Sequence, residues 1–147
     1  MSKKSYRDPP SWAYEDNIKS KFGIIYDDLL KSKKFRSLSL AAQRFYITLV
    51  VHSSTEKAKE CLYNALSETY ELMGEGKSTF DIKAEVYDER KKLFVFPKKQ
   101  YEEYGYTKAY TSKYLNELTE RGFISVWRSG KHQRKVSIYE FSSKWKK

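Results

Sequence analysis

The C-terminal third of this chain carries the pattern that most limits its possible folds. A short β-prone run at 93–96 is followed by two helical segments that meet at Gly105. Gly122 ends the second helical segment, and two alternating segments follow at 123–128 and 135–141, joined by a basic link. Glycine is common just past a helix C-terminus, and period-two alternation is typical of a hairpin. The order strand, helix, turn, helix and hairpin predicts a winged helix-turn-helix.

The two helical segments have clear boundaries. Pro97 is well placed in the first turn of a helix over 98–104, and Thr107 can cap a second helix over 108–121. Tyr114 lies between the two faces of that second helix, so it fits either the core or a contact surface. The face that helical spacing predicts to be buried carries Thr111, Leu115 and Leu118.

The other face of the second helix is the first candidate site. It is polar and basic with one small alanine, so its N-terminal half fits the major groove of duplex DNA and can offer donors to base edges. The alternative for its lysines is an ordinary solvated helix face. The candidate DNA-contacting residues are Thr107, Lys108, Ala109, Tyr110, Ser112, Lys113 and Asn116.

The link between the hairpin segments, with its two ends, is the second candidate site and is called the wing (128–135). Its basic side chains can lie along a phosphate backbone or enter the minor groove, whose negative potential favours arginine. Two basic elements in one module favour DNA binding over a merely solvated surface. The candidate wing residues are Arg128, Lys131, His132, Gln133, Arg134 and Lys135.

The charge distribution points to the same region. Residues 91–147 contain 14 Lys and Arg against 5 Asp and Glu, whereas residues 1–90 contain 15 against 14. Such a basic surface attracts a polyanion, because binding releases the counterions condensed on its phosphates. Duplex DNA is therefore the expected partner, and a membrane surface is the weaker alternative.

We expect an α+β, mainly α fold: a winged helix-turn-helix with an inserted helix and an N-terminal helical arm. The arm spans 1–36 and includes a short amphipathic helix within 22–30 that packs on the main body. The winged domain spans 37–147, and Ser39 can cap its first helix. The residues expected on one side of the short helix are Ile25, Leu29 and Leu30.

The inserted helix is predicted at about 55–73. Ser53 and Glu56 have the spacing of a capping box, and Gly74 follows the helix. The helix either forms a second layer over the core or offers a surface for a dimer or partner. Residues 78–90 alternate as in a strand but are rich in helix formers, which favours a helix. The apolar stripe of the inserted helix contains Ala58, Cys61, Leu62, Ala65, Thr69 and Leu72.

Several classes of protein do not fit the sequence. The longest strongly apolar run, 45–51, is far too short to cross a bilayer, and no export signal follows the basic N-terminus. The single cysteine, Cys61, has no neighbours at metal-ligand spacing and is expected to be a small apolar residue on a helix face. None of the usual catalytic arrangements can be assembled from the residues. A tyrosine nucleophile is the remaining alternative, and it would need a supporting cluster of Arg, Lys and His or of metal ligands that the sequence does not show. We therefore expect a cytoplasmic protein that is not an enzyme and has no cofactor or metal.

Two longer segments, 25–50 and 94–124, resemble small winged-helix proteins of plasmids, prophages and conjugative elements of low-GC Gram-positive bacteria. The resemblance implies control of a mobile element, by transcription regulation or at a replication or transfer origin. Its implied partners are double-stranded DNA, a possible second copy in a homodimer, and a possible replication or transfer protein. The implied DNA-reading positions are Lys108, Ala109, Tyr110, Ser112 and Lys113, with backbone contacts from 131–135.

The sequence leaves one alternative from another class. In it, the inserted helix and the aromatic arm dock a replication or conjugation enzyme, and the basic surface serves only solubility. The residues do not separate regulation of transcription from a role at an origin.

Overall fold

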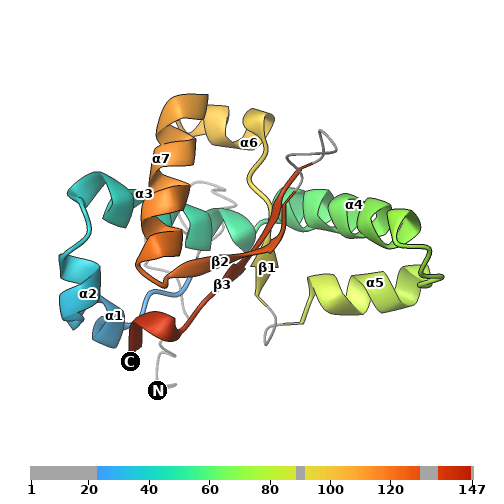
Figure 1. The fold of residues 1–147 in the computed structure, drawn as a ribbon, viewed down its shortest axis with the longest axis horizontal. Helices are drawn as coiled ribbons and strands as arrows, with labels where there is room; N and C mark the ends of the chain where they lie inside the picture. The colour runs from blue at the N-terminus through green and yellow to red at the C-terminus, as the bar shows by residue number, and fades with distance from the viewer. Residues whose placement is uncertain (1–22, 89–91, 130–135, 147) are drawn as a thin grey trace, which may run out of the picture.

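The computed structural model describes residues 23–88, 92–129 and 136–146. The fold is α+β and mainly helical, with a small three-stranded antiparallel sheet (Figure 1), so the predicted fold class is confirmed at this level. The elements in chain order are α1 (Asp27–Lys31), α2 (Lys33–Arg36), α3 (Leu40–Ser53), α4 (Glu56–Leu72), α5 (Thr79–Val86), β1 (Leu93–Phe94), α6 (Lys98–Glu103), α7 (Lys108–Glu120), β2 (Ile124–Arg128), β3 (Ile138–Phe141) and the 3-10 helix η3 (Lys144–Lys146).

The sheet has the strand order β1-β3-β2, so the last strand lies between the other two. Leu93 of β1 pairs with Glu140 of β3, and Ile124 of β2 pairs with Phe141 of β3. The β2–β3 register is interrupted between Val126 and Arg128. The irregularity lies close to the wing, at the end of β2.

A first hydrophobic core joins α1, α2, α3, α6 and α7 to one side of the sheet. Phe45 of α3 is fully buried at its centre, and its ring lies 5.0 Å from that of Tyr106 and 5.7 Å from that of Phe96, measured between centroids. Leu29 and Phe35 belong to the same core. The N-terminal helical segment therefore packs on the main body, as expected.

The N-terminal segment differs from the expected single helix within 22–30. It forms two short helices, because Ser32 adopts extended backbone and its hydroxyl accepts a hydrogen bond from the Phe35 amide. Ile25 precedes the first helix and is only partly buried, and Leu30 is 46% exposed. Only Leu29 of the three predicted residues is fully in the core.

A second hydrophobic core lies between the α4–α5 hairpin and the sheet (Figure 1). This arrangement supports the second-layer interpretation of the inserted helix. The Tyr70 hydroxyl donates to the buried Glu85 carboxylate, and Lys77 Nζ lies 3.0 Å from the same carboxylate. Burial, followed by the bond to Glu85, raises the pKa of Tyr70 to about 12. The core residues are Leu62, Leu66, Tyr70, Ile82, Val86, Leu93, Val95 and Ile138.

Two details of the inserted helix were predicted wrongly. Thr55 is the N-cap, with its hydroxyl accepting from the Ala58 amide, whereas the Ser53 hydroxyl donates back to the Val50 carbonyl inside α3. Leu72, predicted in the buried stripe, is 55% exposed, because the helix buries Leu66 and Tyr70 instead.

The ambiguous segment 78–90 contains a helix, α5, capped by the Ser78 hydroxyl. Its alternating apolar residues therefore do not share one face. Ile82 and Val86 are buried against α4, whereas Phe80 and Ala84 are exposed.

Among the helices of the described ranges, none combines the length and apolar character that crossing a bilayer requires.

Candidate nucleic-acid interface

The α6–α7 pair is built as the sequence predicts. Gly105 has a positive φ of 84°, which a residue with a side chain rarely adopts, and the Tyr106 amide donates to the Tyr101 carbonyl. The Thr107 hydroxyl accepts from the Tyr110 amide and caps α7. Gly122, with a φ of 82°, follows the other end of α7. The two glycines and the cap fix the direction and length of the helix.

The predicted buried face of α7 lies in the first core. Leu118 is fully buried, and Thr111 and Leu115 are 4% and 8% exposed. Tyr114, which the sequence left between two interpretations, is also buried, with its ring 5.5 Å from that of Phe45. Tyr114 is therefore a core residue.

The opposite face of α7 is open to solvent. Tyr110 is 53% exposed and stacks on Tyr114, with 6.0 Å between centroids and 15° between planes. Lys113 Nζ lies 6.0 Å from the centre of the Tyr114 ring. The exposed residues include all seven predicted contacts, Thr107, Lys108, Ala109, Tyr110, Ser112, Lys113 and Asn116.

Charge is divided along α7. The first half carries Lys108 and Lys113, and the second half carries Glu117 and Glu120. Glu117 accepts hydrogen bonds from the Ser39 amide and hydroxyl, at 2.9 Å and 3.0 Å, which ties the second half to the start of α3. The helix macrodipole adds positive potential at the N-terminal end. The N-terminal half is thus the part suited to an anionic partner.

The wing is only partly described. Lys131, His132, Gln133, Arg134 and Lys135 lie outside the described residues. Arg128, at the end of β2, is partly buried, and its Nη1 lies 3.4 Å from the Thr69 carbonyl oxygen of α4. The base of the wing is therefore attached to the inserted helix.

Apolar residues beside the wing were not predicted as part of the site. Trp127 is 37% exposed, and Val126 and Val136 are 49% and 44% exposed. Alternation of apolar residues in a strand usually marks a buried face, so no local pattern separates these residues from the core.

The C-terminal segment packs against the end of α7. The Trp145 ring stacks on Phe123, with centroids 5.9 Å apart and planes 11° apart. Lys144 and Lys146 flank this anchor in η3, and Lys144 lies beside Gly122. Two basic side chains are thereby held near the C-terminal end of α7.

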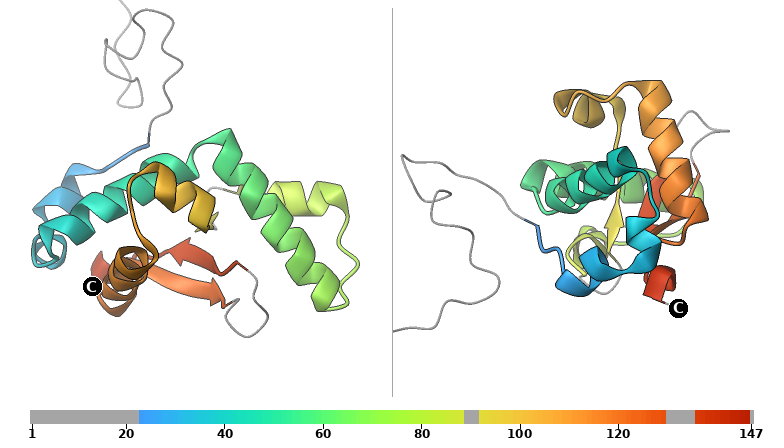
Figure 2. Two further views of the ribbon diagram at one scale, coloured as in Figure 1. Left: turned by 90° about the horizontal axis from the view of Figure 1, so that it is seen from above. Right: turned by 90° about the vertical axis from the view of Figure 1, so that its left-hand side faces the viewer.

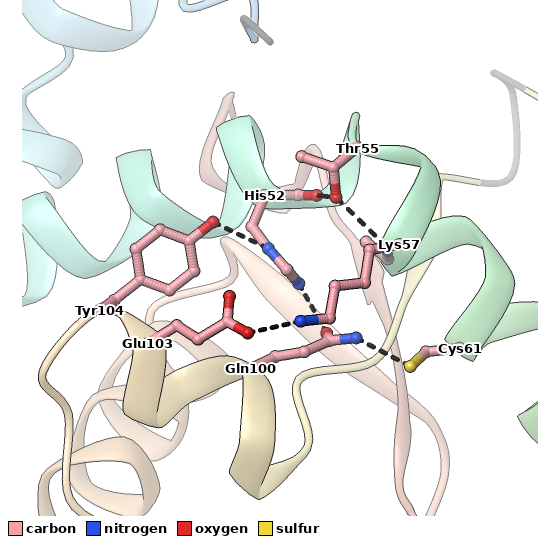
Figure 3. A network of polar contacts seen from close by, with 8 residues as sticks. His52, Thr55, Lys57, Cys61, Gln100, Glu103 and Tyr104 are labelled. Carbon is pink, nitrogen blue, oxygen red and sulfur yellow. Dashed lines mark hydrogen bonds and ion pairs between the residues drawn. The ribbon is translucent and has the colours of Figure 1, made fainter. Parts of the chain in front are cut away.

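A buried polar network sets α6 against α3 and α4 (Figure 3). His52 is 3% exposed, and its Nε2 lies 2.6 Å from Gln100 Oε1 while its Nδ1 lies 2.8 Å from the Tyr104 hydroxyl. Gln100 Nε2 in turn donates to Cys61 Sγ. Because Oε1 can only accept, the neutral His52 ring donates from Nε2 and accepts the Tyr104 proton at Nδ1.

The network has a consequence for ionisation. Burial lowers the pKa of His52 below its ordinary value, against smaller opposing effects of Gln100 and Glu103. Outside the network, Lys57 of α4 forms an ion pair with Glu103 of α6, which raises the pKa of Lys57 and lowers the pKa of Glu103. The members of this cluster lie up to 52 positions apart, so no local sequence pattern predicts it.

The described residues contain no group of three or more His, Cys, Asp or Glu side chains that could hold a metal ion. Comparison of the chain with models of known protein families, with curated proteins and with solved structures found no match.

Proposed function

We propose that this chain is a winged-helix protein that binds duplex DNA sequence-specifically. In this proposal the N-terminal half of α7 enters the major groove, and the wing contacts the adjacent backbone. The strand order β1-β3-β2 and the position of α6 and α7 between β1 and β2 support the winged-helix assignment.

One observation carries the proposal. The seven residues predicted to contact DNA from α7 and its N-cap are all exposed, while the opposite face of that helix forms part of the first core. Neither Lys108 nor Lys113 has an ion-pair partner within the described ranges, and neither is withdrawn into a structural contact with an acidic residue. A helix so arranged offers charge to phosphate and donors to base edges at once.

The proposed role is control of a mobile element. It takes one of two forms, transcription regulation or an accessory function at a replication or transfer origin. The two differ in where the bound DNA lies relative to the gene. A binding measurement on DNA tiled around the gene therefore separates them.

Fluorescence anisotropy with tiled duplexes and a scrambled duplex, at a series of salt concentrations, tests the proposal. We expect one fragment to bind about a thousandfold more tightly than scrambled DNA. Changing Lys108 or Lys113 to Ala should reduce the slope of log affinity against log salt by about 0.9 for each phosphate that the variant no longer neutralises. Lys33→Ala, which removes an exposed lysine from α2, is the matched control and should leave the slope unchanged.

Three results would contradict the proposal in different ways. Equal binding of all duplexes would indicate a non-specific architectural protein. Unchanged affinity after Lys113→Glu combined with Arg134→Glu would place the DNA contacts elsewhere. Absence of binding at every salt concentration would favour the module that docks a replication or conjugation enzyme.

A further inference from the structure

The outward face of α7 has a middle line, directly opposite the buried residues of the helix. Helix α7 lies at the border of the molecule with α3 on its inner side (Figure 2), so this line points away from the first core. At 100° per residue, it passes about 10° from Ala109 and about 30° from Asn116, and both residues are exposed. Lys108 and Tyr110 lie about 90° or more from it, on either side. The surface along Ala109 and Asn116 is here called the central stripe.

Charged and aromatic groups occupy the edges of the central stripe. The Tyr110 ring stacks on the buried Tyr114 ring, with 6.0 Å between centroids, which holds it at one edge. Lys113 starts near the stripe, but its Nζ lies 6.0 Å from the centre of the Tyr114 ring, so the ammonium group leans to the same edge. Lys108 lies at the other edge. These groups are placed for the phosphates on both sides of a groove, and the short side chains between them face its floor.

The central stripe ends at an acidic residue. Glu120 is exposed on the same line, about one turn beyond Asn116, and Glu117 beside it is held by the Ser39 amide and hydroxyl. Two carboxylates oppose the approach of phosphates, so the part of α7 that suits a groove extends from Ala109 to Asn116. These residues cover about 10 Å along the helix, which equals about three base steps of 3.4 Å each.

Building on the duplex binding proposed above, we propose that the central stripe reads A·T base pairs in the major groove. The Asn116 amide carries an N–H donor and an oxygen acceptor, which match N7 and the N6 amino group of adenine. Among the described residues this amide has no hydrogen-bond partner, so both groups are available. The Ala109 methyl offers an apolar contact, and the C5-methyl of thymine is the apolar group in the major groove. The two side chains therefore select an adenine and a thymine about three base steps apart.

G·C pairs fit the central stripe less well. In the two-bond geometry that suits adenine, the Asn116 oxygen would meet O6 of guanine, so that one acceptor faces another. Lysine and arginine are the side chains that satisfy both acceptors of guanine. The nearest cation of α7, Lys113, leans to the edge of the stripe instead. The cations of α7 therefore supply affinity through phosphates, and the central stripe supplies the choice of base.

Selection of duplexes from a randomised pool with the full chain tests the assignment. The wild type and Asn64→Ala, which makes the same change at an exposed position of α4, should enrich one site with a preferred adenine and thymine. Asn116→Ala should lose the preference for that adenine and keep the preference for thymine. Alanine favours helices, so both variants should keep the native circular dichroism spectrum.

Two failures of the selection have different meanings. An enriched site without A·T positions, or a site whose base preferences are unchanged in Asn116→Ala, overturns the base assignment and leaves duplex binding intact. Absence of enrichment by the wild type contradicts sequence-specific duplex binding itself, and the base assignment falls with it.

Fluorescence anisotropy with altered copies of the selected duplex provides the second measurement. 7-Deazaadenine lacks the N7 acceptor and should weaken wild-type binding by about tenfold, while Asn116→Ala should bind both duplexes equally. Uracil in place of thymine removes one methyl group and should weaken wild-type binding by about fourfold, a difference that Ala109→Gly should lose. Asn116→Ala should leave the salt dependence unchanged, because it removes no phosphate contact. Equal wild-type affinity for the natural and both altered duplexes overturns the proposal.

Discussion

His52 shows how a single buried residue makes the stability of this fold depend on pH. Its neutral ring satisfies both Gln100 and Tyr104, and burial holds its pKa below the ordinary value of 6.5. As the pH falls through 6.5, the unfolded chain takes up this proton before the folded chain does. The contribution of His52 to stability is therefore complete above that pH and is lost below it.

We expect His52→Gln to be less stable than the wild type at pH 7.5, by about 1 kcal/mol, because one hydrogen bond of the network is removed. The difference should shrink at pH 5, since the variant has no proton to take up at this position. Urea unfolding of both proteins at the two pH values measures it. His132 is common to both proteins and cancels in the comparison. A stability difference between the two proteins that is the same at both pH values would contradict the assignment of a neutral His52 to the folded protein.

At the scale of elements, helix caps decide where α4 and α7 begin. Thr55→Ala removes the hydroxyl that caps α4 and should cost about 1 kcal/mol of unfolding free energy. Ser53→Ala is the matched control, because the Ser53 hydroxyl donates to a carbonyl of its own helix and caps nothing. Ser53→Ala should lower the unfolding free energy clearly less than Thr55→Ala does. Thermal or urea unfolding of the two variants tests where α4 begins. Equal losses of unfolding free energy would mean that both hydroxyls cap the helix.

The caps also show how far the sequence predicts elements. Ser39 and Thr107 were predicted as caps, and Gly105 and Gly122 were predicted as helix ends, because each acts on backbone within a few residues of itself. Thr55 was missed because Ser53 stands close by with a better match to the capping-box spacing. The choice between them depends on where α3 ends, which packing decides.

In the candidate site, too, local sequence patterns predict some features and long-range packing decides the others. The exposed face of α7 could be predicted, because helical spacing alone separates it from Leu115 and Leu118. The contact of Arg128 with Thr69 could not, since it joins positions 59 apart. Neither could the burial of Tyr114, which depends on the position of Phe45. Long-range packing is the information that local patterns lack.

At the scale of the whole molecule, two cores share one small sheet. Leu66 is fully buried in the second core, between the hairpin and the sheet. Leu66→Ala should destabilise the protein by about 2–5 kcal/mol through reduced burial and the cavity left behind. Because β1 and β3 contribute to both cores, we expect the loss to affect the whole chain.

Urea unfolding followed by both circular dichroism and tryptophan fluorescence tests this coupling. In a background with Trp12→Phe and Trp127→Phe, the fluorescence comes from Trp145, which packs on Phe123 in the first core and so reports on the part of the molecule that Leu66 does not touch. The two signals should shift together in Leu66→Ala. Separate transitions would instead show that the α4–α5 hairpin unfolds as an independent unit.

The central place of β3 has a consequence for the order of folding. Within the described residues β1 and β2 each pair only with β3, so neither can join a sheet before the residues of β3 are in place. Leu93 and Glu140 pair across a long stretch of sequence, and pairings of this kind form slowly. The helices can therefore form before the sheet that joins the two cores.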